Sequence, residues 1–214
     1  MLKVNEIFYS IQGESSYAGR PCVFVRLTGC NLRCSYCDTR YAYEEGEDLD
    51  IGEIINRVTS HRCALVEITG GEPLIQKDTP LLIQKLLDIG FEVLLETNGS
   101  MDIGAIDDRC VKILDIKCPS SGEANKNDIG NLKRLQTKDE IKFVIGNRED
   151  YDYAKNILSL INRATGDSKP PLFSPVYGKI NPELLARWIL ADHLDVRMQI
   201  QLHKIIWGSE TRGV

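Results

Sequence analysis

Three cysteines lie close together in the first quarter of the chain, at Cys30, Cys34 and Cys37, with the spacing C-x3-C-x2-C. A structural zinc site normally has four protein ligands and no free position, whereas three thiolates leave one metal position open for a substrate or a cofactor. The triplet therefore predicts a metal centre that takes part in chemistry. Taken alone, it could also hold zinc, contain a redox pair with a spare thiol, or be a coincidence.

A second motif, Gly70-Gly71-Glu72-Pro73, follows an apolar run that ends at Thr69. Its two glycines allow the backbone to come close to a ligand, although such a segment could also be an ordinary turn. In this order and separation, the two motifs resemble the radical S-adenosylmethionine (SAM) superfamily. The resemblance implies that the cysteine triplet holds a 4Fe-4S cluster with one open iron, and that Gly71 contacts the amino group of SAM.

The remaining cysteines have a different predicted role. A chain with seven cysteines whose first residues, Met1 to Glu6, lack the apolar core of a signal peptide favours metal binding in a reducing compartment over a disulfide framework. We therefore expect a cytoplasmic protein. Cys22, Cys63, Cys110 and Cys118 lie beside apolar residues, and we expect them to be buried as small hydrophobic side chains.

Size and charge narrow the class of protein. The 214 residues contain no linker-like segment, so we expect a single domain over 1–214. A content of 43% hydrophobic and 27% charged residues is typical of a globular protein, and no apolar stretch is long enough to span a membrane. The net charge of −5 opposes nucleic-acid binding, which requires clustered cations. A small-molecule substrate is the better prediction.

Hydrophobic patterning predicts the fold. Short runs rich in β-branched residues predict strands at 23–27, 65–69, 92–96, 111–116, 141–145 and 171–174, with further strands at 6–11 and 196–203. Helical patterns lie at 79–88, 150–161 and 182–193. Because strands alternate with helices, parallel pairing is expected. A complete eight-stranded barrel needs about 250 residues, so we predict an α/β fold, an open partial (β/α) barrel of about six parallel strands with reduced helices.

Chemistry in such barrels gathers at the C-terminal ends of the strands. The cysteine loop follows the strand at 23–27, and the Gly-Gly-Glu-Pro motif follows the next one. The polar segments 96–99 and 115–117 follow the third and fourth strands. These four segments are therefore expected to meet at one rim of the barrel.

Arg26 is a permanent cation within an apolar predicted strand. Burial of an unpaired guanidinium is costly, and its planar fork suits a carboxylate. The partner could be a substrate carboxylate, or an acidic neighbour such as Glu14 in a structural ion pair. Gln12 and Glu14, on either side of Gly13, offer an amide and a carboxylate that could recognise a guanine-like edge.

Three segments, 8–14, 24–32 and 37–39, resemble the 7-carboxy-7-deazaguanine synthase family, and the similarity extends over nearly the whole chain. The resemblance implies a lyase that converts 6-carboxy-5,6,7,8-tetrahydropterin to 7-carboxy-7-deazaguanine with loss of ammonia, a step toward queuosine and other 7-deazapurines. It implies that SAM is a recycled cofactor whose radical abstracts hydrogen from C6 of the pterin. It also implies Mg²⁺, a homodimer, and an electron donor such as flavodoxin or ferredoxin.

The resemblance also assigns site residues. Substrate contacts are implied for Ile11, Gln12, Gly13, Glu14, Arg26, Thr69, His203 and Val214, the last through its terminal carboxylate. SAM contacts are implied for Tyr36, Cys37, Asp38, Gly71, Glu96, Thr97, Asp115, Ile116, Lys117, Ser174, Pro175 and Val176. Thr39 is the implied ligand of Mg²⁺. No catalytic residue is expected beyond these cofactor and substrate ligands.

Two other functions fit parts of the pattern. A small radical-activating enzyme that acts on a protein glycine has a similar cysteine loop, but it needs a groove for a protein segment. A non-enzymatic iron–sulfur or zinc module needs only the cysteines. In such a module, neither the Gly-Gly-Glu-Pro motif nor Arg26 would have a role.

Overall fold

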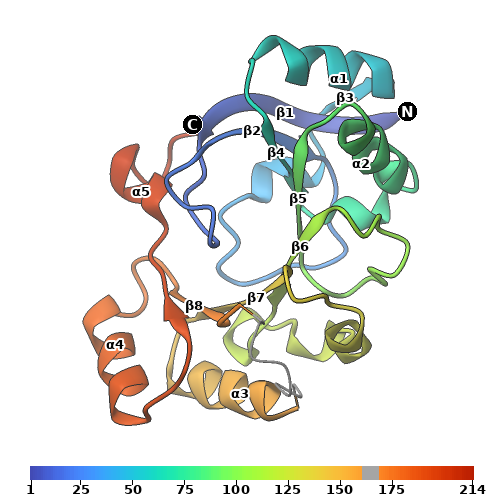
Figure 1. Ribbon diagram of the computed structural model, residues 1–214. Coiled ribbons are helices and arrows are strands. Elements are labelled where there is room, and N and C mark those ends of the chain that lie inside the picture. Colours follow the sequence, from blue (N-terminus) through green and yellow to red (C-terminus); the bar gives the residue numbers. More distant parts are fainter. Residues whose placement is uncertain (161–168) are drawn as a thin grey trace.

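A computed structural model describes residues 1–160 and 169–214, and these form an α/β fold around one curved sheet (Figure 1). In the described residues the sheet order is β3-β1-β2-β4-β5-β6-β7-β8-β9. The strands are β1 Leu2–Ile11, β2 Pro21–Leu27, β3 Glu47–Leu49, β4 Leu65–Gly70, β5 Glu92–Thr97, β6 Val111–Ile116, β7 Glu140–Ile145, β8 Leu172–Pro175 and β9 Arg197–Met198. The α-helices are α1 Ile51–Ser60, α2 Thr79–Asp88, α3 Arg148–Ser159, α4 Pro182–Ala191 and α5 Leu202–Ile206.

All neighbouring strands from β2 to β9 are parallel, whereas β1 is antiparallel to both β2 and β3. Strands β2 and β4 to β8 match the six predicted strands, and the sheet order is linear rather than closed. Helices α1 to α4 cover the outer face of the sheet, and short 3₁₀ turns take the place of helices between β6 and β7 (Figure 1). The predicted open partial barrel with reduced helices is therefore confirmed.

The core lies between this sheet and the outer helices. Successive residues of a strand point to opposite faces, so Val66 and Ile68 of β4 pack against α1 and α2. Glu67, between them, points to the inner face, which carries the polar side chains of the cavity and also a smaller apolar cluster around Phe24 and Leu94. The inner face of the barrel is thus a place for chemistry, and the outer face supplies the apolar burial that stabilises the fold.

The predicted strand at 196–203 is wrong for most of its length. Only Arg197 and Met198 pair with β8, and after the Gln199 N–H donates to the Phe173 carbonyl at 3.0 Å the chain leaves the sheet before β8 ends. The chain then enters α5, whose first backbone N–H, that of Leu202, donates to the carbonyl of Gly13 at 2.9 Å. The alternating pattern had a different cause, since it reflects a half-buried segment rather than a strand.

Other boundaries differ by a few residues. The helix predicted at 150–161 begins at Arg148 and ends at Ser159, and residue 161 lies outside the described residues. The helix predicted at 182–193 ends at Ala191. Helix α1 was not predicted, although Asp50 and Glu53 form a capping box at its start. Within residues 1–160 and 169–214, no helix has the length and apolarity needed to cross a bilayer.

Of the four other cysteines, Cys22, Cys110 and Cys118 are fully buried, as expected, and Cys63 is partly buried. None of the seven cysteines forms a disulfide in the described structure.

Candidate functional site

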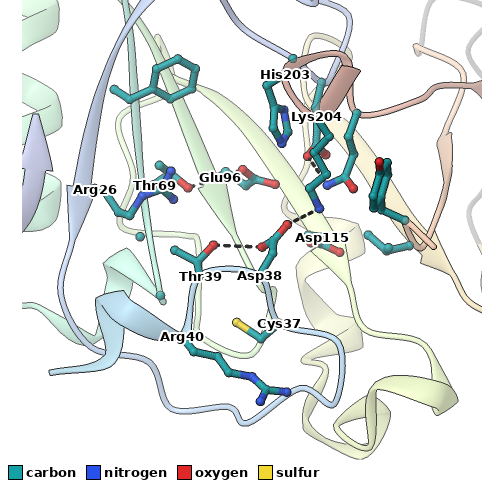
Figure 2. Close-up of a pocket in the computed structure, with 18 of the residues that line it drawn as sticks. Arg26, Cys37, Asp38, Thr39, Arg40, Thr69, Glu96, Asp115, His203 and Lys204 are labelled. Atoms are coloured by element: carbon teal, nitrogen blue, oxygen red, sulfur yellow. Dashed lines mark hydrogen bonds and ion pairs between the residues drawn. The ribbon is translucent and has the colours of Figure 1, made fainter. Parts of the chain in front are cut away.

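A cavity of about 880 Å³ opens at the C-terminal ends of the parallel strands (Figure 2). It brings together almost every residue that sequence reasoning singled out. Its lining includes Ile11, Gln12, Gly13, Glu14, Arg26, Cys30, Cys34, Tyr36, Cys37, Asp38, Thr39, Thr69, Gly71, Glu96, Thr97, Asp115, Lys117, Val176, His203 and Val214. Three predicted SAM-contact residues do not line it: Ile116 packs in the apolar core, Ser174 is buried in β8, and Pro175 lines a second, neighbouring pocket.

The cysteine loop and the Gly-Gly-Glu-Pro turn are packed against each other. A Cβ atom at Gly71 would overlap the carbonyl oxygen of Gly29 and the Cβ of Cys30, and one at Gly70 would overlap the backbone of Leu27. The backbone N–H of Glu72 donates to the Gly29 carbonyl at 2.8 Å. Gly71 is therefore required for contact with the cysteine loop and Gly70 for contact with the end of β2, a packing role in addition to the predicted approach of a ligand.

Glu72 holds the Gly-Gly-Glu-Pro turn against the C-terminal end of the neighbouring strand β5. It is fully buried, and its carboxylate accepts hydrogen bonds from the Thr97 hydroxyl at 2.8 Å, the Asn98 N–H at 2.7 Å and the Leu74 N–H at 3.0 Å. The Asn98 side chain in turn donates to Asn31 of the cysteine loop at 3.1 Å. The Thr97 hydroxyl hydrogen is thus used by Glu72 and its oxygen accepts from the Gly99 N–H at 3.3 Å, so a side-chain contact with SAM could use only the remaining lone pair of that oxygen.

The three thiols at the rim fit an iron–sulfur cluster. All three are free, lie on one loop and line the cavity. Burial raises the pKa of the Cys34 thiol to about 11 and also raises that of Cys30, with Lys117 opposing the rise. Because metal ligation requires thiolates, binding of a cluster would release protons here. Soft sulfur donors with no fourth protein ligand suit a cluster that keeps one position open.

Lys142 is the central cation on the inner face of the barrel. It is 3% exposed, and its ammonium lies 2.8 Å from the Glu14 carboxylate and 3.5 Å from Asp115, and also bonds Glu96. Burial opposes its charge, but Glu14 and Glu96 outweigh burial and raise the pKa of Lys142. Burial likewise acts to raise the pKa of Glu14, but Lys142 holds it at about 2. Both groups are therefore charged near neutral pH.

Arg26 pairs with Glu6 rather than Glu14. Its Nε donates to Glu6 Oε1 at 2.7 Å, and the Tyr41 hydroxyl donates to the same oxygen at 3.0 Å. The β1–β2 register places Glu6 directly opposite Arg26, which explains the partner. The Arg26 side chain is 16% exposed and lines the cavity, so the structure contains the ion pair and also leaves the arginine within reach of a ligand.

Asp38, directly after the last cysteine, connects the cysteine loop to α5 (Figure 2). The Lys204 ammonium donates to one carboxylate oxygen at 2.5 Å, and the Thr39 hydroxyl donates to the other at 3.0 Å. Burial acts to raise the pKa of Asp38, but Lys204 outweighs it and lowers the pKa. Thr39 and Asp38 offer the oxygen donors that Mg²⁺ prefers. Among the described residues, no group of three or more His, Cys, Asp or Glu side chains is arranged to hold a single metal ion. Mg²⁺ would therefore need further oxygens from substrate and water.

His203 reaches the cavity from α5 rather than from a strand end. A Cβ atom at Gly13 would overlap the His203 ring, so glycine at this position allows α5 to pack on the segment after β1. Burial lowers the pKa of His203, with Glu14 opposing, and the imidazole is therefore neutral near pH 7.

The charged residues of the site that sequence reasoning missed include Lys142, Glu67 and Lys204. Lys142 and Glu67 each stand within an apolar strand, and the argument that singled out Arg26 would have found both. Lys204 carries no such signal, because the segment that contains it was interpreted as a half-buried strand.

Comparison with known proteins agrees with this geometry. A family model described as the Radical SAM superfamily matches residues 24–117. The 7-carboxy-7-deazaguanine synthase of Chlorobaculum tepidum is 45% identical, with 100% of this chain and 97% of that protein covered. That of Koribacter versatilis is 42% identical, with 100% of both covered. The crystal structure of QueE from Escherichia coli shares the fold, with a TM-score of 0.77, 23% identity and 94% of each chain covered.

These full-length relatives set aside both alternative functions, the activator of a protein glycine and the non-enzymatic metal module. The cavity, the three rim thiols and the relatives lead to the same conclusion: this chain belongs to the 7-carboxy-7-deazaguanine synthase family of radical SAM enzymes.

Proposed function

We propose that the chain is a radical SAM lyase that converts 6-carboxy-5,6,7,8-tetrahydropterin to 7-carboxy-7-deazaguanine and ammonia, in the biosynthesis of queuosine and other 7-deazapurines. The observation that carries the proposal is one cavity with two unlike ends. Three free thiols lie at its rim, and buried charged groups around Lys142 and Arg26 lie deeper. Such a cavity can hold a redox cofactor and a polar, carboxylate-bearing substrate side by side.

At the rim, Cys30, Cys34 and Cys37 would hold a 4Fe-4S cluster. Together with SAM, such a cluster would supply a carbon-centred radical able to abstract hydrogen from the substrate. The chain's own residues would hold SAM against this loop, and those proposed to do so are Tyr36, Cys37, Asp38, Gly71, Glu96, Thr97, Asp115, Lys117 and Val176. Tyr36 offers a large aromatic surface beside the cysteines for the adenine.

Deeper in the cavity, the substrate carboxylate would bind the terminal nitrogens of Arg26, since Glu6 uses the Nε edge. The Glu14 carboxylate, ionised because its pKa is about 2, would accept hydrogen bonds from the N–H groups of the pterin ring. Thr69, neutral His203 and the segment 11–13 complete the walls. The C-terminal residue Val214 also lines the cavity, and we propose that its carboxylate contacts the substrate.

Several further assignments belong to the proposal. Thr39 is proposed as a ligand of Mg²⁺, supported by its place beside the Asp38 carboxylate. The continuous sheet supports a single domain over 1–214. A homodimer, an electron donor such as flavodoxin or ferredoxin, and a cytoplasmic location are proposed from the family resemblance.

The test is a turnover experiment under anaerobic conditions. The protein is reconstituted with iron and sulfide, and then supplied with SAM, a reductant, Mg²⁺ and the carboxytetrahydropterin. We expect one ammonia per deazaguanine product, with much less SAM consumed than product formed. A Cys34→Ala variant, treated identically, is the matched control. Binding of SAM and pterin without formation of the deazaguanine would contradict the proposal.

A further inference from the structure

Glu67 is a buried acid on the floor of the cavity that none of the roles above uses. It lies in the middle of β4, paired in register with Phe24 of β2 and Leu94 of β5. Its side chain points to the inner face of the barrel and is 2% exposed. Its carboxyl group accepts a hydrogen bond from the side-chain amide of Gln12, which belongs to the segment proposed to bind substrate.

The other half of the Gln12 amide is also engaged. Its oxygen accepts a hydrogen bond from the backbone N–H of Glu14 at 2.7 Å, and Gln12 as a whole is 3% exposed. The amide thus forms a bridge from the strand floor to the backbone that carries the Glu14 carboxylate. With both ends bonded, this side chain positions the segment rather than reading the substrate directly.

The charged groups that face Glu67 come from several elements. They are the carboxylates of Glu14 and Glu96 and the cations Lys142 and Arg26. Lys142 bonds both of those carboxylates, and Arg26 bonds Glu6. Among residues 1–160 and 169–214, no cation lies within ion-pair distance of Glu67 itself. A carboxylate there would be a buried charge without a partner, beside two like charges.

Two physical effects favour the protonated form. Burial raises the pKa of Glu67 well above its usual value, Glu96 raises it further, and Lys142 opposes the rise. A neutral acid still offers the carbonyl oxygen that the Gln12 amide needs, and it adds no charge to a cavity that already holds three carboxylates around Lys142.

We propose that Glu67 is a positioning residue, a neutral carboxylic acid that anchors the Gln12 amide and thereby holds the Gln12–Glu14 segment in place for substrate recognition. The identity of that substrate rests on the function proposed above, but the anchoring itself does not. Glu67 does not touch the reacting atoms, so it acts on substrate binding rather than on the chemical step.

The test compares Glu67→Gln, which keeps a neutral acceptor of the same shape, with Glu67→Leu, which removes the acceptor. We expect Glu67→Gln to keep the KM for the pterin within about twofold, and Glu67→Leu to raise KM by about tenfold, since it loses a buried hydrogen bond. The kcat should stay near that of the wild type in both, because the cysteine loop is untouched. Glu47→Gln, at an exposed site on β3, is the control.

Two measurements on the resting protein need no turnover. The infrared difference spectrum between wild type and Glu67→Gln should show loss of the carbonyl band of a protonated carboxylic acid at neutral pH. Hydrogen exchange at the Glu14 amide should be faster in Glu67→Leu and unchanged in Glu67→Gln. These readouts separate failure of the anchor from failure of the proposed reaction, which wild-type turnover tests alone.

Three results would overturn the proposal. If Glu67→Gln were as impaired as Glu67→Leu, the negative charge rather than the acceptor would be needed. Absence of the protonated-acid band would show that Glu67 is ionised. An unchanged rate of hydrogen exchange at the Glu14 amide in Glu67→Leu would show that the Gln12 bridge does not hold the segment. If Glu67→Leu does not fold, the infrared band and the KM of Glu67→Gln still decide.

Discussion

Replacement of Lys142 by methionine is expected to destabilise the protein strongly. The ammonium is buried and serves Glu14, Glu96 and Asp115 together. Methionine has a similar shape and fills the volume of the side chain, but it leaves these carboxylates near one another without their shared cation. Removal of one partner from a buried ion pair costs about 3 to 5 kcal/mol.

The lowered pKa of Glu14 gives an independent measure of how much these buried charges contribute to the free energy of unfolding. It falls from an ordinary value of 4.5 to about 2 in the folded protein, and this difference corresponds to about 3 kcal/mol of stability. Because the folded pKa is the lower one, this contribution is fully present above the unfolded pKa and is lost as the pH falls toward the folded pKa. Near pH 3, about 1 kcal/mol of it remains.

Urea unfolding of the metal-free protein measures both effects. Near pH 7, Lys142→Met should lower the free energy of unfolding by about 3 to 5 kcal/mol. The difference from wild type should shrink near pH 3, because protonated carboxyls no longer need the cation. Lys85→Met, at an exposed site of α2, should change the free energy by less than about 0.5 kcal/mol. A loss near pH 7 no larger than that of Lys85→Met would refute the assigned role of Lys142.

Three further predictions concern the ligands. We expect loss of the site-differentiated cluster and of turnover in each of Cys30→Ala, Cys34→Ala and Cys37→Ala, whereas Cys63→Ala should keep both. Iron and sulfide analysis measures the cluster content. A full cluster with normal turnover in any of the first three variants would show that the ligand assignment is wrong. Thr39→Ala should weaken the dependence of turnover on Mg²⁺ and spare SAM binding. An unchanged titration of activity with Mg²⁺ would show that Thr39 is not a ligand of the ion. Arg26→Lys should weaken substrate binding by about 30-fold to several thousand-fold with SAM affinity preserved, because an ammonium cannot reproduce the bidentate fork. A large loss of thermal stability with unaltered affinity would instead mean that Arg26 serves only its ion pair with Glu6.

The strands could be predicted because each carries its own local signal. Buried parallel strands read as continuous apolar runs, and the motifs that follow them had to share one rim once the strands were known to be parallel. For this reason the placement of the cysteine loop, Gly71 and Glu96 around one cavity followed from the sequence. The short edge strand β9 has no such run, and the alternating residues that follow Met198 were interpreted as its continuation.

Partners across the sheet could not be predicted, because they depend on register. The sequence shows that Arg26 needs an anion, but only the antiparallel β1–β2 pairing shows that Glu6 lies opposite it. Glu14 is taken by Lys142, which lies 128 positions further along the chain. Such long-range ion pairs leave no trace in local spacing, and the side chains that make them can be found only as charges in apolar strands.

The contact between Gly70-Gly71 and the cysteine loop has a consequence for the order of assembly. Gly71 packs against Gly29 and Cys30, and the Glu72 N–H donates to the Gly29 carbonyl, so protein contacts hold the start of the loop in addition to any metal. Zinc fingers, by contrast, unfold when their ion is removed. We therefore expect a chelator to strip iron from this protein while the fold survives. After oxygen has destroyed a cluster, the metal-free cysteine loop should accept new iron and sulfide while the protein stays folded.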